Sequence, residues 1–418
     1  MKTFVKNTAA VLALFLTFVL GGGAAMAQGA RTPVVLFTGF HFTKLLVTVE
    51  NQTAFPGCPA SGTFEDWYGA DNTGTAFSQV CQDQLETLVY DADPSKPMPE
   101  RFSEQPGVTV TLKDYGTTES APFYEDLYVF LEGAGYVRNQ DIRVAGYDAR
   151  LTPDMGGFLE RTVALIEDTY QDNGNTPVHL VGHSNGPLYA QYLLTHTTQA
   201  WKNKYIHGFT PIAGNWPGQG FFYMVYFTGF NVSTFSFPAN HANAASSAAM
   251  YESHPSSYMS SADPAVFGNQ EVVVRSQGTS YTPQDNLQLF ADAGLTIAQE
   301  IAPYYTGFVK FADPANFPNV DVYAEKGSGV DTIVGAKLPG LLVGKVLNLK
   351  NPTTFYFRDG DGNQEDITND SIQVWSNMAC YRFGLTDNPG VDHFTIVANA
   401  NVLQRLLTNL QRTKSVCP

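Results

Sequence analysis

The chain has 418 residues, of which 44% are hydrophobic and 15% are charged, and its formal net charge at pH 7 is −15. This length and composition allow a large buried core and exclude a chain that is disordered throughout. The excess of acidic residues argues against nucleic-acid binding, which needs cationic patches, and offers no electrostatic attraction to anionic membranes. Any contact with lipid is therefore expected to be mainly apolar.

The N-terminus has the pattern of a secretory signal peptide. Lys2 and Lys6 precede a mostly apolar run at residues 9–20, and Ala-Met-Ala at residues 25–27 matches an A-x-A cleavage site. We therefore expect residues 1–27 to be removed, which takes away two lysines and moves the formal charge to about −17. Residues 28–418 contain no apolar run long enough to cross a membrane, so the mature protein is expected to be soluble outside the cytosol.

Cysteine usage fits an exported protein. An even number of cysteines in such a chain indicates two disulfides, and three pairings are open from the sequence alone. The two local pairings, Cys58–Cys81 and Cys380–Cys417, are the simplest. No C-x-x-C spacing favours zinc. Glycosylation sequons begin at Asn51, Asn231 and Asn369.

The first part of the chain alternates between strands and helices. Residues 34–37 form a continuous apolar run, which is typical of a buried strand in a parallel sheet. Residues from about 52 to 91 contain the first cysteine pair, and we interpret them as an inserted loop closed by a disulfide. The spacing of apolar residues predicts helices over 121–135 and 157–170, with a strand over 142–145 between them.

Three further elements follow. Residues 178–181 are predicted to form a strand, residues 187–194 an amphipathic helix opened by Pro187, and residues 208–213 another strand. Repeated alternation of this kind predicts an α/β domain with a mostly parallel central sheet.

The alternation stops after Trp216. Residues about 217–318 are rich in Gly, Pro, Ser, Asn and aromatic residues, and a long irregular insertion in a compact domain is usually a lid or a binding element. We therefore predict a cap or lid over this range. Residues 320–323 and 354–357 are predicted to resume the sheet, and residues 399–412 to form the final helix.

The turn before the helix at 187–194 is the most informative stretch of the chain. It reads Gly182-His183-Ser184-Asn185-Gly186, a G-x-S-x-G pentapeptide. Between a strand and a helix this motif is typical of a nucleophile elbow, whose strained, crowded turn is relieved by residues without a Cβ. The geometry exposes the serine hydroxyl to a base, so Ser184 is the candidate nucleophile.

The chain order of an α/β-hydrolase triad, serine then acid then histidine, selects the base. The chain has eight histidines, and only His393 lies beyond His254, in a turn just before the predicted final helix. His393 is therefore the candidate base. The acid stays open between Asp361, which directly follows a predicted strand, and Asp359 and Asp331.

A calcium site at the acid loop is disfavoured. The D-x-D-x-N pattern that begins at Asp359 resembles an EF-hand loop, but Gln364 stands where glycine is needed and Asp370 where glutamate is needed. We expect no metal and no other cofactor.

The oxyanion hole of such an enzyme needs two backbone N–H donors. One is expected from Asn185, the residue after the nucleophile, and the other from the loop Gly39-Phe40-His41 that follows the first strand. A backbone donor does not depend on its own side chain, so the bulky Phe40 is compatible with this role.

Several separated stretches resemble one family. They are Pro-Val-Val-Leu-Phe-Thr-Gly-Phe from residue 33, Phe-Glu-Asp-Trp from 64 with Cys-Gln-Asp-Gln-Leu from 81, Gly-Tyr-Asp-Ala-Arg from 146, His-Ser-Asn-Gly from 183, Asp-Gly-Asp-Gly from 359 and Asp-His from 392. In this order they resemble the lecithin:cholesterol acyltransferase / lysosomal phospholipase A2 family. The likeness spans nearly the whole mature chain.

The resemblance implies an α/β-hydrolase fold with a membrane-binding disulfide loop and a lid. It also implies that Ser184 is the nucleophile, Asp361 the acid and His393 the base, with the amides of Phe40 and Asn185 in the oxyanion hole. The family enzymes take an acyl chain from a glycerophospholipid onto serine and pass it to an alcohol, such as a sterol, or to water.

This chain departs from the family pattern beside the expected pocket. Thr38 stands in place of proline, Phe40 in place of a polar residue and Ala149 in place of a tryptophan. The family's small-Pro-Trp-Gly segment becomes Gly-Asn-Trp-Pro-Gly from residue 214. These changes bear on acyl-chain and acceptor preference more than on the chemistry.

Aromatic residues in the two insertions are the candidates for lipid contact. Trp67 and Tyr68 lie in the disulfide loop, and these residue types suit the headgroup interface. Phe221 and Phe222 open the most apolar stretch after the serine helix, and that stretch either contacts lipid or lines an acyl channel under the lid. The expected partner is a phospholipid membrane or a lipoprotein surface, met in a secreted, endolysosomal or periplasmic location.

The leading hypothesis is therefore a secreted serine O-acyltransferase or phospholipase that works through an acyl-serine. A neutral-lipid or carboxyl-ester lipase with the same triad is the alternative within enzymes. A catalytically idle lipid-binding protein on a hydrolase scaffold is the alternative from another class, and the complete set of Ser184, Asp361 and His393 argues against it.

Overall fold

The computed structural model describes residues 31–417, apart from 73, 233–235, 237–239, 270–271, 277 and 339–353. The predicted signal peptide, residues 1–27, lies outside the described residues. Within the described ranges, none of the helices is both long and apolar enough to cross a membrane.

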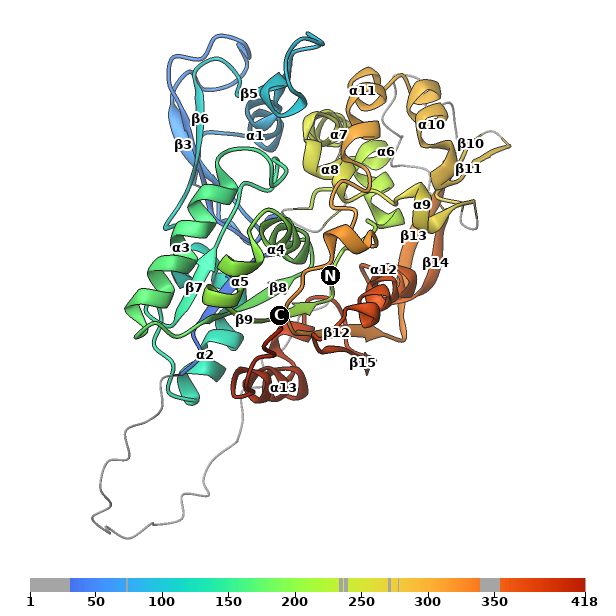
Figure 1. Cartoon of the computed structure of the whole chain (residues 1–418). Coiled ribbons are helices and arrows are strands. Elements are labelled where there is room, and N and C mark those ends of the chain that lie inside the picture. The colour runs from blue at the N-terminus through green and yellow to red at the C-terminus, as the bar shows by residue number, and fades with distance from the viewer. Residues whose placement is uncertain are drawn as a thin grey trace, which may run out of the picture. The chain divides into compact units, whose positions relative to one another are not determined.

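A six-stranded sheet forms the centre of the fold (Figure 1). Its strand order is β15-β12-β9-β8-β1-β7, and each neighbouring pair is parallel. The strands are β1 (Val34–Phe37), β7 (Ile142–Ala145), β8 (Val178–His183), β9 (Ile206–Ile212), β12 (Val322–Ser328) and β15 (Phe383–Pro389). The predicted parallel sheet is confirmed, although the sequence pattern did not reveal β15.

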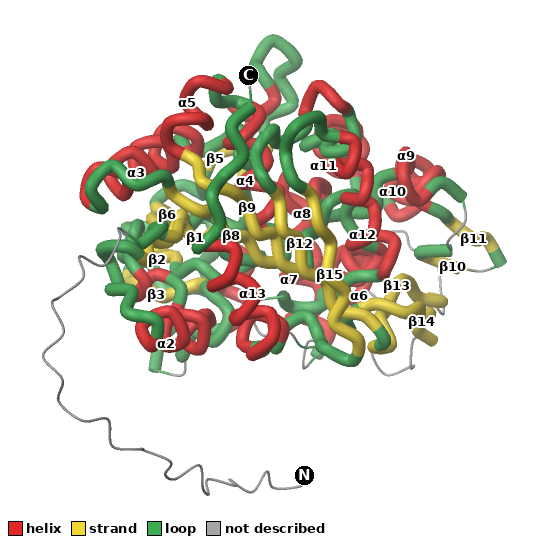
Figure 2. Tube along the Cα trace, turned by 60° about the horizontal axis from the view of Figure 1, so that its bottom comes forward, coloured by secondary structure: helices red, strands yellow, loops and turns green. Residues whose placement is uncertain are grey.

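Helices cover both faces of this sheet (Figure 2). The faces can be told apart along β1, where Val34 and Leu36 pack into one core cluster and Val35 and Phe37 into another. The first cluster is covered by α2 (Glu125–Gly133) and α13 (Ala400–Leu410), and the second by α3 (Phe158–Asp172) and α4 (Gly186–Thr195), with α5 (Gln199–Tyr205) beside them. The result is an α/β arrangement with helices on both faces of a parallel sheet.

The segment at residues 52–91 contains more regular structure than a loop. It contributes β3 (Gly62–Asp66) to an antiparallel sheet with β2 (Leu45–Val49) and β6 (Val108–Leu112), and it continues into α1 (Gln79–Glu86). The next strand, β4 (Val89–Tyr90), pairs with β5 (Phe102–Ser103). The predicted disulfide within this segment is present, whereas its strands were not predicted because they are too short for a clear period-two pattern.

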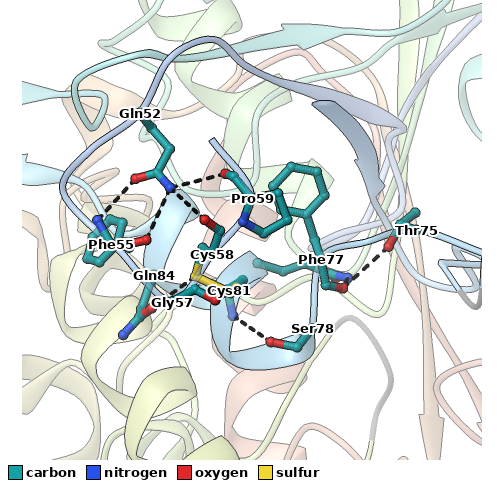
Figure 3. Close-up of a disulfide and its surroundings, with 11 residues drawn as sticks. Gln52, Phe55, Gly57, Cys58, Pro59, Thr75, Phe77, Ser78, Cys81 and Gln84 are labelled. Atoms are coloured by element: carbon teal, nitrogen blue, oxygen red, sulfur yellow. Dashed lines mark hydrogen bonds between the residues drawn. A yellow bond between two sulfur atoms is a disulfide. The ribbon is translucent and has the colours of Figure 1, made fainter. Parts of the chain in front are cut away.

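Both disulfides join cysteines that are near in sequence. Cys58 bonds to Cys81 on α1, and the Gln52 amide holds the turn around Cys58 by donating to the carbonyl oxygens of Phe55, Cys58 and Pro59 at 3.1–3.2 Å (Figure 3). Cys380 bonds to Cys417 and so ties the chain after α13 to the segment before β15. Together these two local disulfides are one of the three connectivities that the sequence left open.

The described part of residues 217–318 contains six α-helices, of which the sequence pattern indicated only the one near residues 285–294, now seen as α10 (Asn286–Ala293). The cap helices are α6 (Tyr223–Thr228), α7 (His241–Ser253), α8 (Pro255–Met259), α9 (Pro264–Phe267), α10 (Asn286–Ala293) and α11 (Thr296–Tyr305). They surround one apolar cluster that contains most of the residues from 221 to 230. The helices are short, and Gly, Pro and Ser at their ends hid their periodicity in the sequence.

A second sheet lies against the cap helices. Its order is β11-β10-β13-β14, made of β10 (Val274–Ser276), β11 (Thr279–Tyr281), β13 (Val330–Leu338) and β14 (Thr354–Gly360). The prediction that residues 354–357 resume the central sheet was wrong, because β14 pairs antiparallel with β13 instead. The edge of the central sheet is taken by β15.

The remaining elements are one α-helix turn and short 3-10 helices. They are α12 (Asp366–Asp370), η1 (Met98–Arg101), η2 (Thr118–Ser120), η3 (Pro122–Tyr124), η4 (Gly220–Phe222), η5 (Pro283–Asp285), η6 (Pro314–Asn316), η7 (Ser371–Asn377) and η8 (Ile396–Ala398).

Candidate active site

Ser184 stands on the sharp turn between β8 and α4, at the carboxyl end of the central sheet. Its φ of 60° lies in the left-handed region, which a non-glycine residue adopts only when its surroundings hold it there. A Cβ on Gly186 would lie 2.2 Å from the Phe37 carbonyl oxygen, and one on Gly182 would lie 2.9 Å from the Pro187 nitrogen. The flanking glycines are therefore required by close packing of this turn against β1 and α4.

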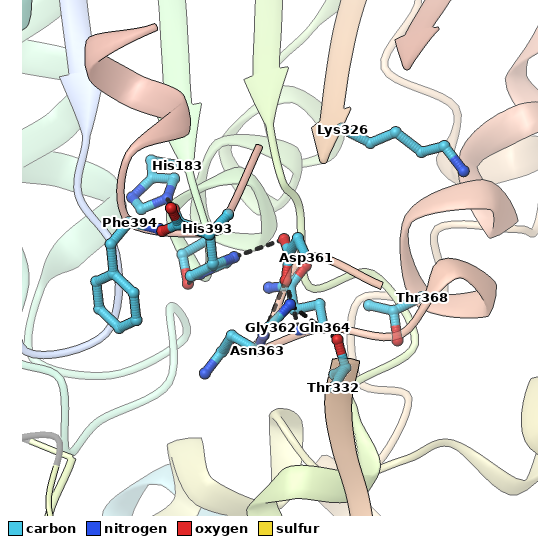
Figure 4. Close-up of polar contacts among 12 residues, drawn as sticks. His183, Lys326, Thr332, Asp361, Gly362, Asn363, Gln364, Thr368, His393 and Phe394 are labelled. Carbon is cyan, nitrogen blue, oxygen red and sulfur yellow. Dashed lines mark hydrogen bonds and ion pairs between the residues drawn. The ribbon is translucent and has the colours of Figure 1, made fainter. Parts of the chain in front are cut away.

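His393 faces Ser184 from the loop between β15 and η8. Its Nε2 lies 2.9 Å from Ser184 Oγ, and its Nδ1 lies 2.8 Å from Asp361 Oδ2. Figure 4 shows the imidazole ring turned towards Asp361. The His393 main-chain N–H also donates to the Asp361 carbonyl oxygen at 2.8 Å, so backbone and side chain fix the pair together.

Asp361 follows β14 and is fully buried. Its second carboxylate oxygen, Oδ1, accepts hydrogen bonds from the main-chain N–H groups of Asn363 at 3.0 Å and Gln364 at 2.7 Å. Asp359 Oδ1 instead accepts from the Gly329 and Gly360 amides, and Asp331 is exposed on β13. Of the three candidate acids, the structure brings Asp361 to His393.

The loop after β1 passes directly beside the serine. A Cβ on Gly39 would lie 3.0 Å from Ser184 Cβ and 2.4 Å from the Phe42 ring, so only glycine fits there. Phe40 follows, with its ring packed edge-on against Phe222 at 5.3 Å. Asn185 caps the N-terminus of α4, where backbone N–H groups favour a developing negative charge.

A series of buried polar groups connects the loop after β1 to the loop that carries His393, and the sequence did not reveal it. The Gly39 N–H donates to Tyr124 Oη at 2.7 Å, and Tyr124 Oη lies 3.1 Å from His183 Nδ1. His183 Nε2 lies 2.9 Å from the His393 carbonyl oxygen. Burial lowers the pKa of His183 well below its usual value, so this imidazole is neutral. His183 was visible within the G-x-S-x-G motif, whereas nothing in the sequence singled out Tyr124.

A pocket with many aromatic side chains in its walls opens beside Ser184. It is lined by Phe40, Phe42, Tyr68, Ser184, Asn185, Asn215, Gln219, Phe221, Phe222, Val232, Asn363, His393 and Phe394. None of these described lining residues is Lys, Arg, Asp or Glu. The pocket therefore suits an apolar chain with neutral polar groups near the serine.

The predicted lipid-contact residues occupy two kinds of place. Tyr68, Phe221 and Phe222 line the pocket, and the two phenylalanines are buried in the cap cluster. Trp67 is half-buried outside this pocket, where its Nε1–H donates to Glu65 Oε2 at 2.9 Å and Lys44 Nζ lies 5.3 Å from its ring centre.

Comparison with known proteins gives relatives along most of the chain. The lysosomal phospholipase A and acyltransferase of Homo sapiens is 26% identical over 417 residues, covering 95% of this chain and 94% of its own length. The Mus musculus protein of the same name is 29% identical and covers 72% of each chain. The phosphatidylcholine-sterol acyltransferase of Rattus norvegicus is 25% identical over 73% of this chain and 68% of its own.

A solved structure shares the fold. The crystal structure of the Tle4–Tli4 complex aligns with 92% of this chain and 100% of its own, with a TM-score of 0.51 and 13% identity. The family model described as lecithin:cholesterol acyltransferase matches residues 93–329, which is more than half of the sequence. The chain thus belongs to the lecithin:cholesterol acyltransferase family.

Proposed function

We propose that the protein transfers an acyl chain from a glycerophospholipid onto Ser184 and then to an alcohol or to water. The observation that carries this proposal is the continuous contact from Ser184 Oγ through His393 to Asp361, at 2.9 and 2.8 Å, at the floor of an aromatic pocket. The relatives named as phospholipase A and acyltransferase support the same substrate and reaction class.

In the first step, Ser184 Oγ attacks the ester carbonyl carbon and His393 Nε2 takes the serine proton. Asp361 accepts the His393 Nδ1–H and stabilises the imidazolium. The carbonyl oxygen gains negative charge, and we expect the main-chain N–H groups of Phe40 and Asn185 to bind it. The proton then passes from His393 to the departing lysophospholipid oxygen, and an acyl-serine remains.

In the second step, an alcohol or a water molecule enters beside His393 and attacks the acyl-serine. Because the same imidazole serves both steps, the acceptor is decided by what the pocket holds after the lysophospholipid leaves. Water gives a free fatty acid, and an alcohol gives an ester.

The donor would be drawn from a lipid surface. Tyr68, Phe221 and Phe222 supply apolar pocket walls for the acyl chain, and Trp67 supplies an aromatic side chain near the surface of the disulfide segment. We propose a phospholipid membrane or lipoprotein surface as the partner. A secreted, endolysosomal or periplasmic location follows from the signal pattern at residues 1–27 and agrees with the lysosomal names of several relatives.

One observation favours a second candidate, a neutral-lipid or carboxyl-ester lipase. No Lys or Arg is among the described residues that line the pocket, so nothing there pairs with a lipid phosphate. A phospholipid headgroup would then have to remain outside the pocket, in the solvent or at the membrane surface.

The test is incubation of the mature protein with phosphatidylcholine vesicles, with and without a sterol, beside trioleoylglycerol emulsions and a Ser184→Ala variant. Product analysis by mass spectrometry should give lysophospholipid together with fatty acid or an ester, from the unaltered protein only. Fatty acid from trioleoylglycerol alone would favour the lipase, and products that persist in Ser184→Ala would contradict the serine mechanism.

A further inference from the structure

Three side-chain amides on the wall of the pocket contain a polar atom without a partner. Within the described residues, Asn185 Nδ2, Asn215 Oδ1 and Gln219 Oε1 have no hydrogen-bond partner. The three side chains are 1%, 1% and 3% exposed, and all three line the pocket that contains Ser184. A buried polar atom without a partner is unfavourable, so its presence beside a nucleophile calls for an explanation.

Hydrogen bonds hold the side chains of Asn185 and Asn215 and the main chain of Gln219 in place. Asn185 Oδ1 accepts from Asn215 Nδ2 at 3.1 Å and from Ser260 Oγ at 3.2 Å. The Asn215 N–H donates to the Ser184 carbonyl oxygen at 2.9 Å. The Gln219 N–H donates to the Ser260 carbonyl oxygen at 3.0 Å. The residues around these polar atoms are therefore fixed relative to the serine, from the end of β9 and from the cap.

The polar atoms of these three side chains indicate which kind of ligand would bind beside them. The pocket walls among the described residues carry no Lys, Arg, Asp or Glu, so neither a phosphate nor an ammonium group would find an opposite charge. A hydroxyl is both a donor and an acceptor, so it can satisfy an amide nitrogen and an amide oxygen alike. The matching ligand is a neutral alcohol.

We propose that Asn185, Asn215 and Gln219 form a subsite that binds a non-reacting hydroxyl of the acyl acceptor. The preferred acceptor is then a diol or polyol, whose second hydroxyl faces these amides while the first faces His393. A sterol has a single hydroxyl and would leave the amide atoms without partners. This inference rests on the acyl-transfer function proposed above and specifies its acceptor.

The transfer step balances with the residues present. The reacting hydroxyl oxygen bonds to the acyl carbon and gives its proton to His393 Nε2. The bond from that carbon to Ser184 Oγ then breaks, and Ser184 Oγ takes the proton back from His393. The products are the free serine and a monoester of the diol, with its second hydroxyl intact.

The test compares two acceptors that differ by one hydroxyl, 1-hexadecanol and 1,2-hexadecanediol. Each is mixed at equal concentration into dioleoylphosphatidylcholine vesicles, with cholesterol as a third arm. The ester formed is divided by the total acyl groups released, so that differences in vesicle binding cancel. We expect the diol to exceed the mono-alcohol by about three- to tenfold, the usual contribution of one hydrogen bond.

The variant Gln219→Met removes one amide and keeps the length of the side chain. It should lower the diol-to-mono-alcohol ratio, whereas Gln411→Met, the same exchange at an exposed position after α13, should leave the ratio at the wild-type value. A wild-type ratio near one, a ratio unchanged in Gln219→Met, or cholesterol as the best acceptor would each overturn the subsite. Absence of any Ser184-dependent product would instead contradict the proposed function, so the two failures can be told apart.

Discussion

His183 donates a hydrogen bond from Nε2 to the main-chain carbonyl oxygen of His393, over 2.9 Å. The direction of this hydrogen bond follows from the neighbouring hydrogen bond between Tyr124 and His183. Tyr124 Oη already accepts from the Gly39 N–H, so its own proton is directed to His183 Nδ1. The neutral imidazole must then carry its proton on Nε2. His183, the residue before Ser184, thus holds the loop that carries His393 and, through Tyr124, the loop that carries Gly39.

The variant Tyr124→Phe should lower kcat by about tenfold with little change in KM. It removes the acceptor of the Gly39 amide and the donor to His183, and a net loss of about 1–1.5 kcal/mol in positioning corresponds to roughly that factor. Steady-state kinetics on a soluble p-nitrophenyl ester would measure it. Tyr128→Phe is the matched control, because Tyr128 is equally buried one turn along α2 but donates to the Ala121 carbonyl oxygen. Equal losses in both variants would indicate a general packing effect.

The variant Asp361→Asn should reduce kcat by about 10⁴-fold, because an amide at this position no longer orients His393 or stabilises its protonated form. Asp359→Asn changes the same charge two residues away, where the carboxylate accepts from the Gly329 and Gly360 amides. Asp359→Asn should therefore lower kcat by less than about tenfold. The measurement is the burst of acyl-serine formation with the soluble ester. A larger loss in Asp359→Asn than in Asp361→Asn would assign the acid role to the other carboxylate.

Short sequence patterns predicted the turn around Ser184, because its structure is set by a few neighbouring residues. The elbow around Ser184 combines a strand, a strained turn and a helix within a few residues, so spacing and composition reveal it. His393 could be found by chain order alone. Asp361 needed the family resemblance, because its loop follows a strand of the second sheet that the sequence assigned to the central one.

The parts of the site and the fold that the sequence did not predict depend on contacts between residues far apart in the chain. Tyr124 meets His183 across 59 positions, and Ser260 meets Asn185 across 75. No periodicity encodes such pairs. The same reason applies to β15, which is an edge strand only partly buried and lacks the continuous apolar run of a central strand.

The variant Trp67→Ala should weaken activity on phosphatidylcholine vesicles by several-fold and leave hydrolysis of a soluble ester unchanged, if the disulfide segment meets the lipid surface. Trp201→Ala is a matched control. Both indoles are half-buried and donate to a glutamate, Trp67 to Glu65 and Trp201 to Glu167, at 2.9 and 2.7 Å. Vesicle co-sedimentation would show whether the loss lies in binding. Parallel losses on both substrates would argue against a surface role for Trp67.

Asp83 is a buried carboxylate between the disulfide segment and the cap. It lies on α1, and its Oδ2 accepts hydrogen bonds from Ser246 Oγ at 2.5 Å and Ser247 Oγ at 2.8 Å on α7. Gln79 Nε2 donates to its Oδ1 at 2.6 Å. Burial raises the pKa of the Asp83 carboxyl to about 6, against the opposing effect of the two serine hydroxyls.

This raised pKa makes the joint between α1 and α7 sensitive to pH. Between the ordinary aspartate pKa of about 4 and about 6, the folded state binds more protons than the unfolded state, so stability falls as pH rises through this window. Asp83→Asn cannot ionise and still offers an oxygen to the serines. Its melting temperature should therefore exceed that of the unaltered protein at pH 7.5, by the equivalent of up to about 3 kcal/mol, and the difference should shrink at pH 4.5. Thermal unfolding at both pH values would measure this, with the exposed Asp126→Asn on α2 as the control. A difference that does not change with pH would show that Asp83 is not protonated on folding.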